Sequence, residues 1–420
     1  MRSALSTLAA TAACLVGLAI LTAAPAPAQP ILAHDLDHPY KLGRTPAGNL
    51  LVAESGTGAH DGRLLMIARH GRQHVLISGL PSGILPQGEA IGPTAVADAH
   101  RTLYVLIGEG DVTGPAPPGS QVPNPDGLSS PIFSAVLRAE FDPVPDGVRT
   151  GFHLEEDALR ALADGREVTL ENEDGERVNL LLLADFRDLE PDPVLGVRQA
   201  NPFAMALHGD LEPADLEELG FAGVSPQAAE FLARLEPDSP LGRRLRERTR
   251  LWVVDSGMNT IVEVQADTGR HRVLTRFPPL PNPLAPDLGP PVMEPVPTGL
   301  HVRDGGELLV TLLPGFPFPP GSSGVYRVDT ATGAFTPWIE GLSSATDVLE
   351  VGGDTYVLEL STDFLAGAPG RILRFTDPEA APEVVAEGLI TPAGMSHDPV
   401  HHELVVTESF PGVIRRIALD

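Results

Sequence analysis

Short apolar strands separated by polar turns recur along this chain at a nearly constant spacing. The segments 297–310, 345–358 and 392–406 each contain a start of small residues, an apolar strand, a turn rich in glycine and aspartate, and a second strand rich in β-branched residues. Their first residues lie 48 and 47 positions apart. A repeat of about 40 to 50 residues made of short strands is typical of the blades of a β-propeller.

The same pattern occurs three more times upstream, with first strands that begin at Pro39, Pro93 and Pro202. The sequence therefore predicts an all-β fold, a six-bladed β-propeller. We also expect 31–36 to form the outermost strand of the last blade, beside 413–419. Such pairing of the two chain ends would close the ring and remove its open sheet edges.

Two intervals between first strands are longer than one repeat, which predicts insertions at 143–178 and 209–250. For the first insertion we expect one helix over 154–162 and a hairpin that turns at Asp174 and Gly175. For the second we expect three short helices, because Ser-Pro pairs and a glycine provide helix starts and a stop.

The order of strands in a propeller assigns each connection to a face. The connections between strands 2 and 3, and between one blade and the next, lie on one face, here called the front face. The connections between strands 1 and 2 and between strands 3 and 4 lie on the opposite, back face. Both insertions interrupt back-face connections, so we expect them on this one face, packed together as a small cap.

The first 28 residues have the features of an export signal. Arg2 precedes an apolar run over 8–24, and Ala26-Pro27-Ala28 provides a small-residue cleavage site. We expect cleavage after Ala28, a mature propeller of residues 29–420, and a periplasmic or extracellular location. The one cysteine, Cys14, lies within the signal, so the mature chain would fold without disulfides.

The charge balance restricts the classes of partner. The chain has 56 acidic and 29 basic residues, a formal net charge of −27. Nucleic acid and anionic membranes both require a basic surface, so neither is an expected partner. Nucleophile elbows, phosphate-binding loops and dinucleotide-binding glycine motifs do not occur in the sequence, so the sequence favours binding over catalysis.

Carboxylates end the second strands of five blades, and equivalent positions would place them around the channel mouth on the front face. Converging carboxylates would repel one another, raise their pKa values or bind a cation, and Ca²⁺ suits oxygen ligands best. The alternative is that each carboxylate caps amides of its own loop. No cofactor is predicted otherwise. The candidates for a ligand or cation site are Glu54, Glu109, Asp255, Glu359 and Glu408.

Long proline-rich connections also belong to the front face. Proline restricts φ, so such segments hold their shape at low entropic cost. The segment 314–321 has Phe316 and Phe318 between prolines, which makes these two residues candidates for a partner-binding loop. The alternative is that these connections pack over the rim of the propeller. On the back face, Asp398, His401 and His402 share a turn, where surface histidines are expected rather than a metal site.

With the blades assigned, the chain resembles the ScyD/ScyE family, exported six-bladed propellers of the scytonemin gene cluster that are related to NHL-repeat and TolB-like propellers. The resemblance depends on 201–207, 251–264 and 296–300, and above all on the Gly-Phe-Pro-Phe-Pro-Pro-Gly loop within 313–328. It covers 31–420 apart from the insertions. The resemblance implies a propeller and an exported location, but no catalytic residue.

Three functions follow in order of preference. The first is a non-catalytic scaffold that binds a small ligand or a protein at the acidic, proline-rimmed channel mouth. The second is a calcium-dependent, lactonase-like hydrolase with a carboxylate as the base. The third is a quinone-dependent sugar dehydrogenase, which ranks last because an anionic cofactor would need cationic residues where the sequence provides acidic ones.

Overall fold

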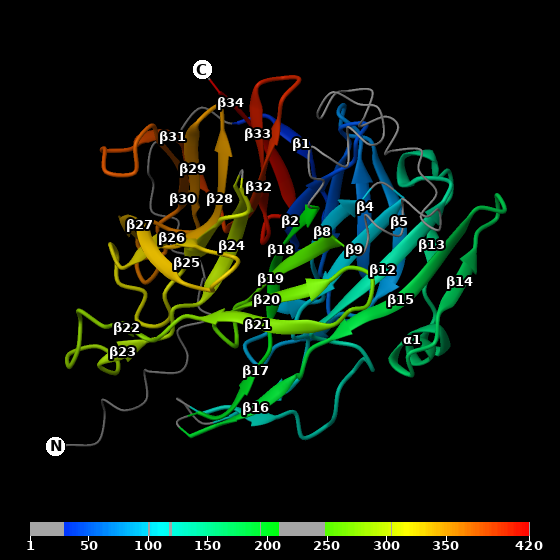
Figure 1. Ribbon diagram of the computed structural model, residues 1–420, viewed down its shortest axis with the longest axis horizontal. Helices are drawn as coiled ribbons and strands as arrows, with labels where there is room; N and C mark the ends of the chain where they lie inside the picture. Colours follow the sequence, from blue (N-terminus) through cyan, green and yellow to red (C-terminus); the bar gives the residue numbers. More distant parts are fainter. Residues whose placement is uncertain are drawn as a thin grey trace.

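Six antiparallel sheets stand around a common axis (Figure 1). The computed structural model describes residues 29–99, 101–116, 120–193, 195–209, 248–303 and 305–419. The first strand of each sheet contacts the first strands of the two neighbouring sheets, and the last sheet contacts the first. The chain is therefore a six-bladed β-propeller, and the prediction from the repeat is confirmed.

Blades one to three start at the predicted prolines. Blade one consists of β2 (Pro39–Arg44), β3 (Leu50–Glu54), β4 (Gly62–Ile67) and β5 (Gln73–Leu80). Blade two consists of β8 (Pro93–Ala99), β9 (Thr102–Ile107), β12 (Ala135–Asp142) and β15 (Arg177–Asp185), with β14 (Val168–Glu171) added outside. Blade three consists of β18 (Pro202–Gly209), β19 (Thr249–Asp255), β20 (Thr260–Gln265) and β21 (His271–Arg276).

Blades four to six follow the repeats from which the fold was predicted. Blade four consists of β24 (Pro297–Val302), β25 (Leu308–Leu312), β26 (Ser323–Val328) and β27 (Phe335–Leu342). Blade five consists of β28 (Ala345–Val351), β29 (Asp354–Glu359), β30 (Gly370–Phe375) and β31 (Glu383–Leu389). Blade six consists of β32 (Pro392–Asp398), β33 (Glu403–Glu408), β34 (Val413–Ala418) and β1 (Ile31–Ala33).

Buried hydroxyl groups join each blade to the next near the front-face ends of the first strands. Each hydroxyl donates to a main-chain carbonyl at the start of the first strand of the following blade, which satisfies a buried acceptor. The six bonds form a complete belt. They join Ser55 Oγ to Pro93 O (3.1 Å), Thr94 Oγ1 to Pro202 O (3.0 Å), Ser256 Oγ to Pro297 O (2.6 Å), Thr298 Oγ1 to Ala345 O (3.0 Å), Thr346 Oγ1 to Pro392 O (3.4 Å) and Thr407 Oγ1 to Tyr40 O (2.7 Å).

The N-terminal strand closes the ring as the sequence predicts. Strand β1 pairs antiparallel with β34, with Ala33 opposite Ile414, and the Leu36 amide donates to Gly412 O at 3.0 Å. Ala33 and Leu36 are buried in the apolar cluster between blades six and one. Blade six is therefore assembled from both ends of the propeller sequence, β1 near its start and β32–β34 at its end.

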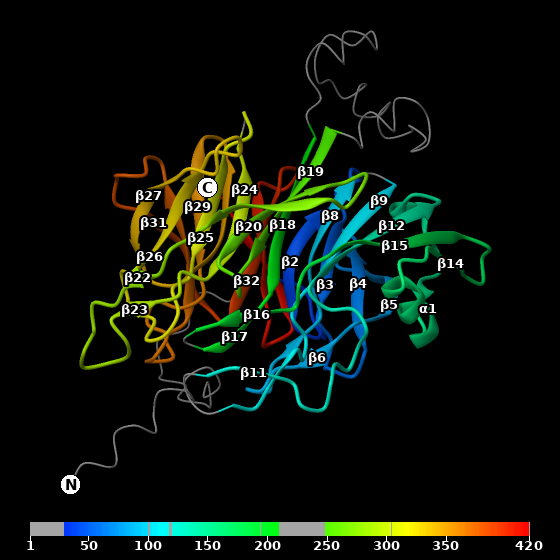
Figure 2. The ribbon, with the colours of Figure 1, turned by 60° about the horizontal axis from the view of Figure 1, so that its bottom comes forward.

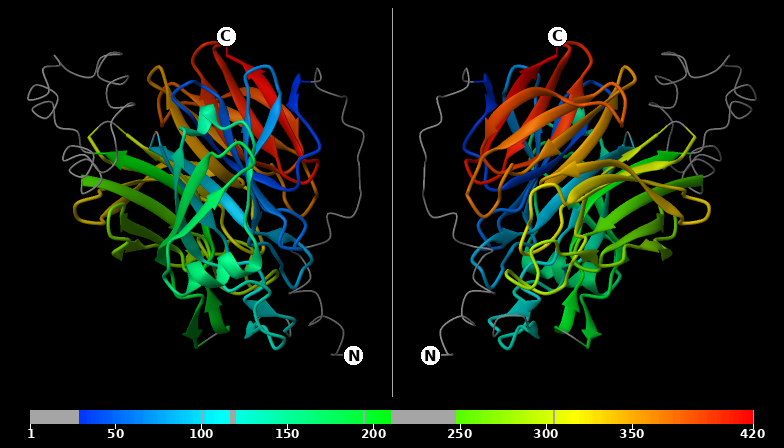
Figure 3. Two further views of the ribbon diagram at one scale, coloured as in Figure 1. Left: turned by 90° about the vertical axis from the view of Figure 1, so that its right-hand side faces the viewer. Right: turned by 90° about the vertical axis from the view of Figure 1, so that its left-hand side faces the viewer.

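The first insertion lies in the connection between strands 3 and 4 of blade two, as predicted. Its chain then runs along the outer edge of blade one (Figure 3, left). It contains η1 (Pro145–Gly147), β13 (Phe152–His153) and α1 (Glu156–Ala163), followed by the predicted hairpin of β14 and β15. Strand β13 pairs parallel with β5. Gly151 permits this approach, because a Cβ atom there would lie 2.3 Å from Val75 O.

Apolar residues of this insertion explain why it covers the flank rather than the back face. Phe152, Leu159 and Leu162 are buried in the cluster that fills the space between blades one and two. Strand β18 ends at Gly209 and β19 starts at Thr249, so the second insertion also interrupts the predicted connection. The helices expected for this insertion lie outside the described residues. The expected cap and the export signal lie outside them as well. Within the described ranges, no helix is long and apolar enough to cross a membrane.

Small ribbons build the rim of the front face, in the lower part of Figure 2. Each consists of two short antiparallel strands inserted in a front-face connection. The pairs are β6 (Gly83–Ile84) with β7 (Ala90–Ile91), β10 (Thr113–Gly114) with β11 (Val122–Pro123), β16 (Leu189–Asp192) with β17 (Gly196–Gln199), and β22 (Leu280–Pro281) with β23 (Val292–Met293).

Candidate functional site

Three of the predicted site carboxylates, Glu54, Glu359 and Glu408, have no exposed surface and are bonded within their own blades. Each accepts an amide two residues before the first strand of its blade. These amides belong to Asp37 (2.9 Å), Ser343 (2.6 Å) and Ile390 (2.5 Å). Each also pairs with an arginine of its third strand: Arg63, Arg371 and Arg415, respectively.

Asp255 has the same position in blade three but no arginine partner. Its Oδ1 atom accepts the amides of Asn201 at 2.8 Å and Met258 at 3.0 Å. Burial raises the pKa of Asp255 to about 6, although these amides favour the charged form. The structure thus assigns four of the five predicted carboxylates to local bonds that hold the start of the first strand.

Glu109 does not occupy the predicted position at the end of the second strand. The register pairs Pro93 with Ile107, so Ile107 is the residue of blade two that matches the other four candidates, and Glu109 lies two residues further along the chain. Glu109 is 4% exposed, and its Oε2 atom has no hydrogen-bond partner among the described residues. Burial raises the pKa of Glu109 to about 8, a hydrogen bond with Gln199 opposes the shift, and the charges of Glu89 and Asp255 add to it. Glu109 therefore keeps its proton at neutral pH, unlike an ordinary glutamate.

This raised pKa predicts a pH-dependent stability that Glu109→Gln removes. Between the ordinary pKa of about 4.5 and the folded value of about 8, the unfolded chain releases the proton and the folded chain retains it. This group therefore makes the protein less stable as the pH rises through that window, by at most about 1.4 kcal/mol per pH unit. We expect the stability of Glu109→Gln relative to the unmodified chain to rise from pH 5 to pH 8.

Urea unfolding in the presence of a chelator, at pH 5, 6, 7 and 8, measures this difference. Glu403→Gln, a change of another carboxylate in the propeller, serves as the control and should show no such trend. Parallel pH profiles for Glu109→Gln and the unmodified chain would contradict the assignment.

Apolar side chains close the front-face half of the channel. Tyr40, Phe203 and Ala393 come from the first strands of blades one, three and six and meet across the axis, together with Leu85 and Ile91 of the β6–β7 connection. The rings of Tyr40 and Phe203 lie 5.2 Å apart, edge to face. These apolar residues are here called the channel plug. The Tyr40 hydroxyl donates to Glu89 Oε1 at 2.6 Å, and this bond attaches the channel plug to the β6–β7 connection.

A buried ion pair lies next to this plug. Lys41 Nζ donates to the carbonyls of Thr346 and Ala393, each at 2.7 Å, and lies 3.5 Å from Asp347 Oδ1. Asp347 Oδ2 accepts the amide of Met395 at 2.9 Å. Burial lowers the pKa of Lys41 and raises that of Asp347, and the opposite charge of each partner counteracts both shifts. The pair connects blades one, five and six.

Beyond this pair, the channel contains a cavity of about 260 Å³. Its lining comes from the first strands of five blades, β2, β18, β24, β28 and β32. The residues extend toward the ends of these strands, so the cavity lies in the back-face half of the channel. Its walls combine apolar side chains, such as Met205, Leu300, Leu349 and Met395, with nearly as many polar ones. The polar and charged lining residues are Lys41, His301, Asp347, Glu350, Ser396 and His397.

Two buried nitrogen atoms beside this cavity have no hydrogen-bond partner in the part of the chain that the structure describes: Arg44 Nη2 and His397 Nε2. The Nε atom of Arg44 donates to Ser396 Oγ at 3.0 Å, and Ser396 lines the cavity. Burial lowers the pKa of His397, and the positive charge of Arg44 lowers it further. His397 is therefore neutral at neutral pH, and Arg44 provides the positive charge at this edge.

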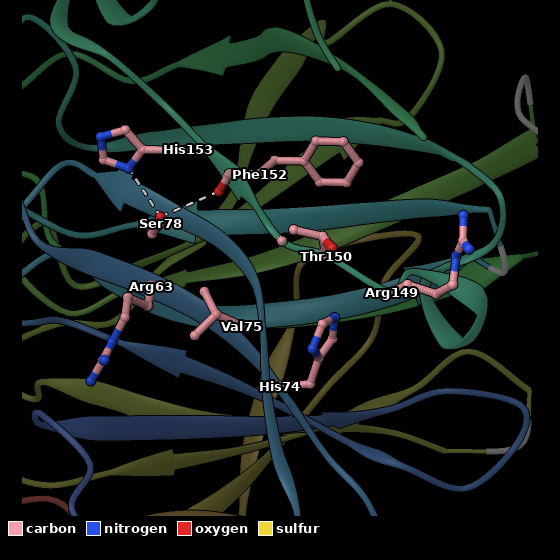
Figure 4. A pocket seen from close by; sticks show the side chains of 9 residues that line it. Arg63, His74, Val75, Ser78, Arg149, Thr150, Phe152 and His153 are labelled. Atoms are coloured by element: carbon pink, nitrogen blue, oxygen red, sulfur yellow. Dashed lines mark hydrogen bonds between the residues drawn. The ribbon is translucent and has the colours of Figure 1, made fainter. Parts of the chain in front are cut away.

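A second hollow, of about 540 Å³, lies on the flank beside the first insertion (Figure 4). Arg63, His74, Arg149 and His153 line it. Its arginines have partners: Arg63 pairs with Glu54 and Asp37, and Arg149 pairs with Glu176. Ser78 bonds to both Phe152 O and the His153 ring. These contacts hold the insertion against β5, so a structural role explains the hollow.

The aromatic loop of blade four is half-buried. The Phe318 ring packs on Phe364 with centroids 4.4 Å apart and meets Phe316 edge-on at 6.3 Å. These rings join the 2–3 connections of blades four and five on the front face. On the back face, Asp398, His401 and Glu403 form the one group of three metal-ligating side chains within 4.8 Å in the described part of the chain. Asp398 also accepts the Val400 amide at 2.9 Å, which is typical of an Asx turn.

Sequence reasoning missed the contents of the channel. Neither Lys41 nor Asp347 was a candidate, although Lys41 is the one lysine of a chain rich in arginine. This single lysine could have indicated the buried ion pair from the sequence. An ammonium group with three donors fits a buried site bounded by two carbonyls and a carboxylate.

No protein-family model and no curated protein sequence matches the chain. Among solved structures, it is similar to the PQQ-bound form of an aldose sugar dehydrogenase from Streptomyces coelicolor (12% identity, 93% of this chain and 97% of that chain, TM-score 0.42). It is also similar to a gluconolactonase from Xanthomonas campestris (11%, 92% and 88%, TM-score 0.44) and to a chain of a nidogen–laminin complex (11%, 88% and 93%, TM-score 0.40). Similarities this low assign no activity to the chain.

Proposed function

We propose that this chain is an exported, non-catalytic binding propeller of the ScyD/ScyE type, and that its ligand occupies the back-face half of the central channel. The observation that carries the proposal is the 260 Å³ cavity, which is formed by first strands alone. Ligand pockets are typically concave and combine apolar side chains with placed polar groups, and this cavity contains both kinds.

The use of the carboxylates also supports binding over the calcium-dependent hydrolase. A calcium-dependent hydrolase would require several strand-end carboxylates to converge on one cation and one substrate. Glu54, Glu359 and Glu408 instead bond to amides and arginines of their own blades. These interactions stabilise the blades, so the channel cavity is the better-formed candidate for a binding site.

The cavity indicates the chemical class of the ligand. Leu300, Leu349 and Met395 provide an apolar wall for a small hydrocarbon or aromatic body. Arg44 Nη2 has N–H groups without acceptors at the edge of the cavity. A buried donor is costly when unpaired, so a ligand that brings a carboxylate or carbonyl oxygen to this edge would be favoured. We therefore expect a small, largely apolar compound with one acceptor group.

A pair of matched probes tests this expectation. Benzoate has the acceptor group and toluene lacks it, and saturation-transfer NMR measures the binding of both to the mature protein. We expect benzoate to bind more tightly than toluene. Met205→Trp should abolish binding of both probes by filling the cavity, whereas Val400→Trp, at an exposed turn, should retain it. Absence of saturable binding, or equal binding by Met205→Trp, would contradict the proposal.

A further inference from the structure

Exposed apolar side chains are concentrated on the front face. Thirteen large apolar side chains are exposed in the part of the chain that the structure describes, and nine of them lie in front-face connections. The described back-face connections expose one, Val400. Scattered exposed leucines need no explanation, but a one-sided distribution indicates an interaction surface. Six of the nine lie in the connections of blades two to five: Val122, Leu128, Leu284, Leu288, Val292 and Leu365.

The short ribbons of these connections are joined to one another. The Gln121 amide, beside β11, donates to Leu195 O at the turn of the β16–β17 ribbon, at 2.7 Å. Arg198 of β17 pairs with Glu294, next to the β22–β23 ribbon, at 2.8 Å. These ribbons therefore form one continuous edge in the lower part of Figure 2.

The same edge continues into blades four and five. The Gly315 amide donates to Glu294 O at 2.8 Å, which joins the aromatic loop of blade four to the β22–β23 connection. The Phe318 ring then packs on Phe364 of blade five, with centroids 4.4 Å apart. The described residues of these connections are here called the front rim: 108–134, 186–201, 277–296, 313–322 and 360–369.

The front rim is acidic as well as apolar. It contains nine acidic residues and two basic ones. One of the basic residues, Arg198, is already paired with Asp192 and Glu294. In three of its connections an aspartate lies within two residues of an exposed leucine. These pairs are Asp126 with Leu128, Asp287 with Leu288 and Asp363 with Leu365.

This composition restricts the partner. A partner that covers the leucines also removes water from the neighbouring carboxylates, and a dehydrated carboxylate is costly unless it is paired. A second copy of the chain would bring the same carboxylates, and an anionic membrane or nucleic acid would bring phosphates, so each of them would add repulsion. The front rim also extends over the connections of four blades, which is more than a small compound covers.

We propose that the front rim is a docking surface for a protein segment that combines leucine-like side chains with lysine or arginine. The apolar side chains of this partner would cover Leu288, Val292 and Leu365, and its cations would pair with Asp287 and Asp363. Prolines fix the shape of the rim before binding, so docking costs little conformational entropy. The charges would determine the association rate and the choice of partner, and the apolar contacts would slow dissociation.

Fluorescence anisotropy with labelled amphipathic peptides of about 15 residues tests the surface of the mature protein. One peptide contains leucine and lysine, a second has glutamate in place of lysine, and a third has serine in place of leucine. We expect saturable binding of the leucine–lysine peptide at about 0.15 M salt, weaker binding of the serine–lysine peptide and no binding of the leucine–glutamate peptide. Leu288→Ser and Asp287→Lys should each weaken binding by about fivefold, because one removes apolar contact and the other reverses a charge.

Val400→Ser and Glu379→Lys are the matched controls, since they make corresponding changes at exposed positions of the back face, and both should bind the peptide as the unmodified chain does. Met205→Trp should also retain peptide binding, so this test and the benzoate test can fail separately. The proposal fails if the serine–lysine peptide binds as tightly as the leucine–lysine peptide, or if the back-face variants weaken binding as much as the rim variants. It also fails if sedimentation shows a dimer that Leu288→Ser dissociates, because the occupant would then be a second copy of the chain.

Discussion

Deletion of residues 29–37 is expected to lower the melting temperature of the mature protein more than any single substitution on its surface. The deletion removes β1, exposes the edge of β34 and uncovers the apolar cluster that contains Ala33 and Leu36. It also opens the ring at the one blade that is assembled from both chain ends. The loss of stability should far exceed the roughly 1 kcal/mol of an average point substitution, and an open sheet edge should promote aggregation.

Two point variants separate the role of the strand from the effect of shortening the chain. Ala33 is 2% exposed and Ile31 is 51% exposed, although both belong to β1. Ala33→Arg should reproduce much of the destabilisation, because it buries a charge without a partner. Ile31→Ser should change the unfolding free energy by about 0.5 kcal/mol or less. Thermal unfolding followed by circular dichroism measures all three. A deletion variant that melts with the unmodified protein would show that β1 does not close the ring.

Lys41→Met is expected to destabilise the propeller by about 3–5 kcal/mol, the usual effect of removing one partner of a buried ion pair. The substitution leaves Asp347 buried without its counter-charge, and it leaves the carbonyls of Thr346 and Ala393 without a donor. The double variant Lys41→Met, Asp347→Asn should recover part of the loss, because no unpaired charge remains.

The control for this double-mutant cycle is the exposed ion pair of Arg160 and Glu156 on α1. Arg160→Met should leave the melting temperature unchanged, since exposed pairs contribute little. Urea unfolding of the single and double variants measures the coupling between Lys41 and Asp347. Equal effects of Lys41→Met and Arg160→Met, or a double variant no more stable than Lys41→Met, would contradict the role assigned to the buried pair.

The strand-end carboxylates and the cavity differ in how far the sequence could predict them. Glu109 was predicted to match Glu54, Asp255, Glu359 and Glu408, but the register gives that position in blade two to Ile107. The sequence could not show which carboxylates pair with arginine, because the arginines that pair with Glu54, Glu359 and Glu408 lie on the third strands, at different distances along the chain. The cavity was not predicted at all, since its apolar residues look like ordinary strand interiors.

The sequence by itself determined the architecture: six blades, their first strands, the pairing of β1 with β34 and the connections that both insertions interrupt. These features depend on the repeat and on the period-two pattern of strands, which are local and recur in every blade. Only the tertiary structure decided what fills the channel and which partner each carboxylate has. Lys41 bonds to residues 305 and 352 positions away, and contacts over such separations depend on side-chain directions around the closed ring, which no local pattern encodes.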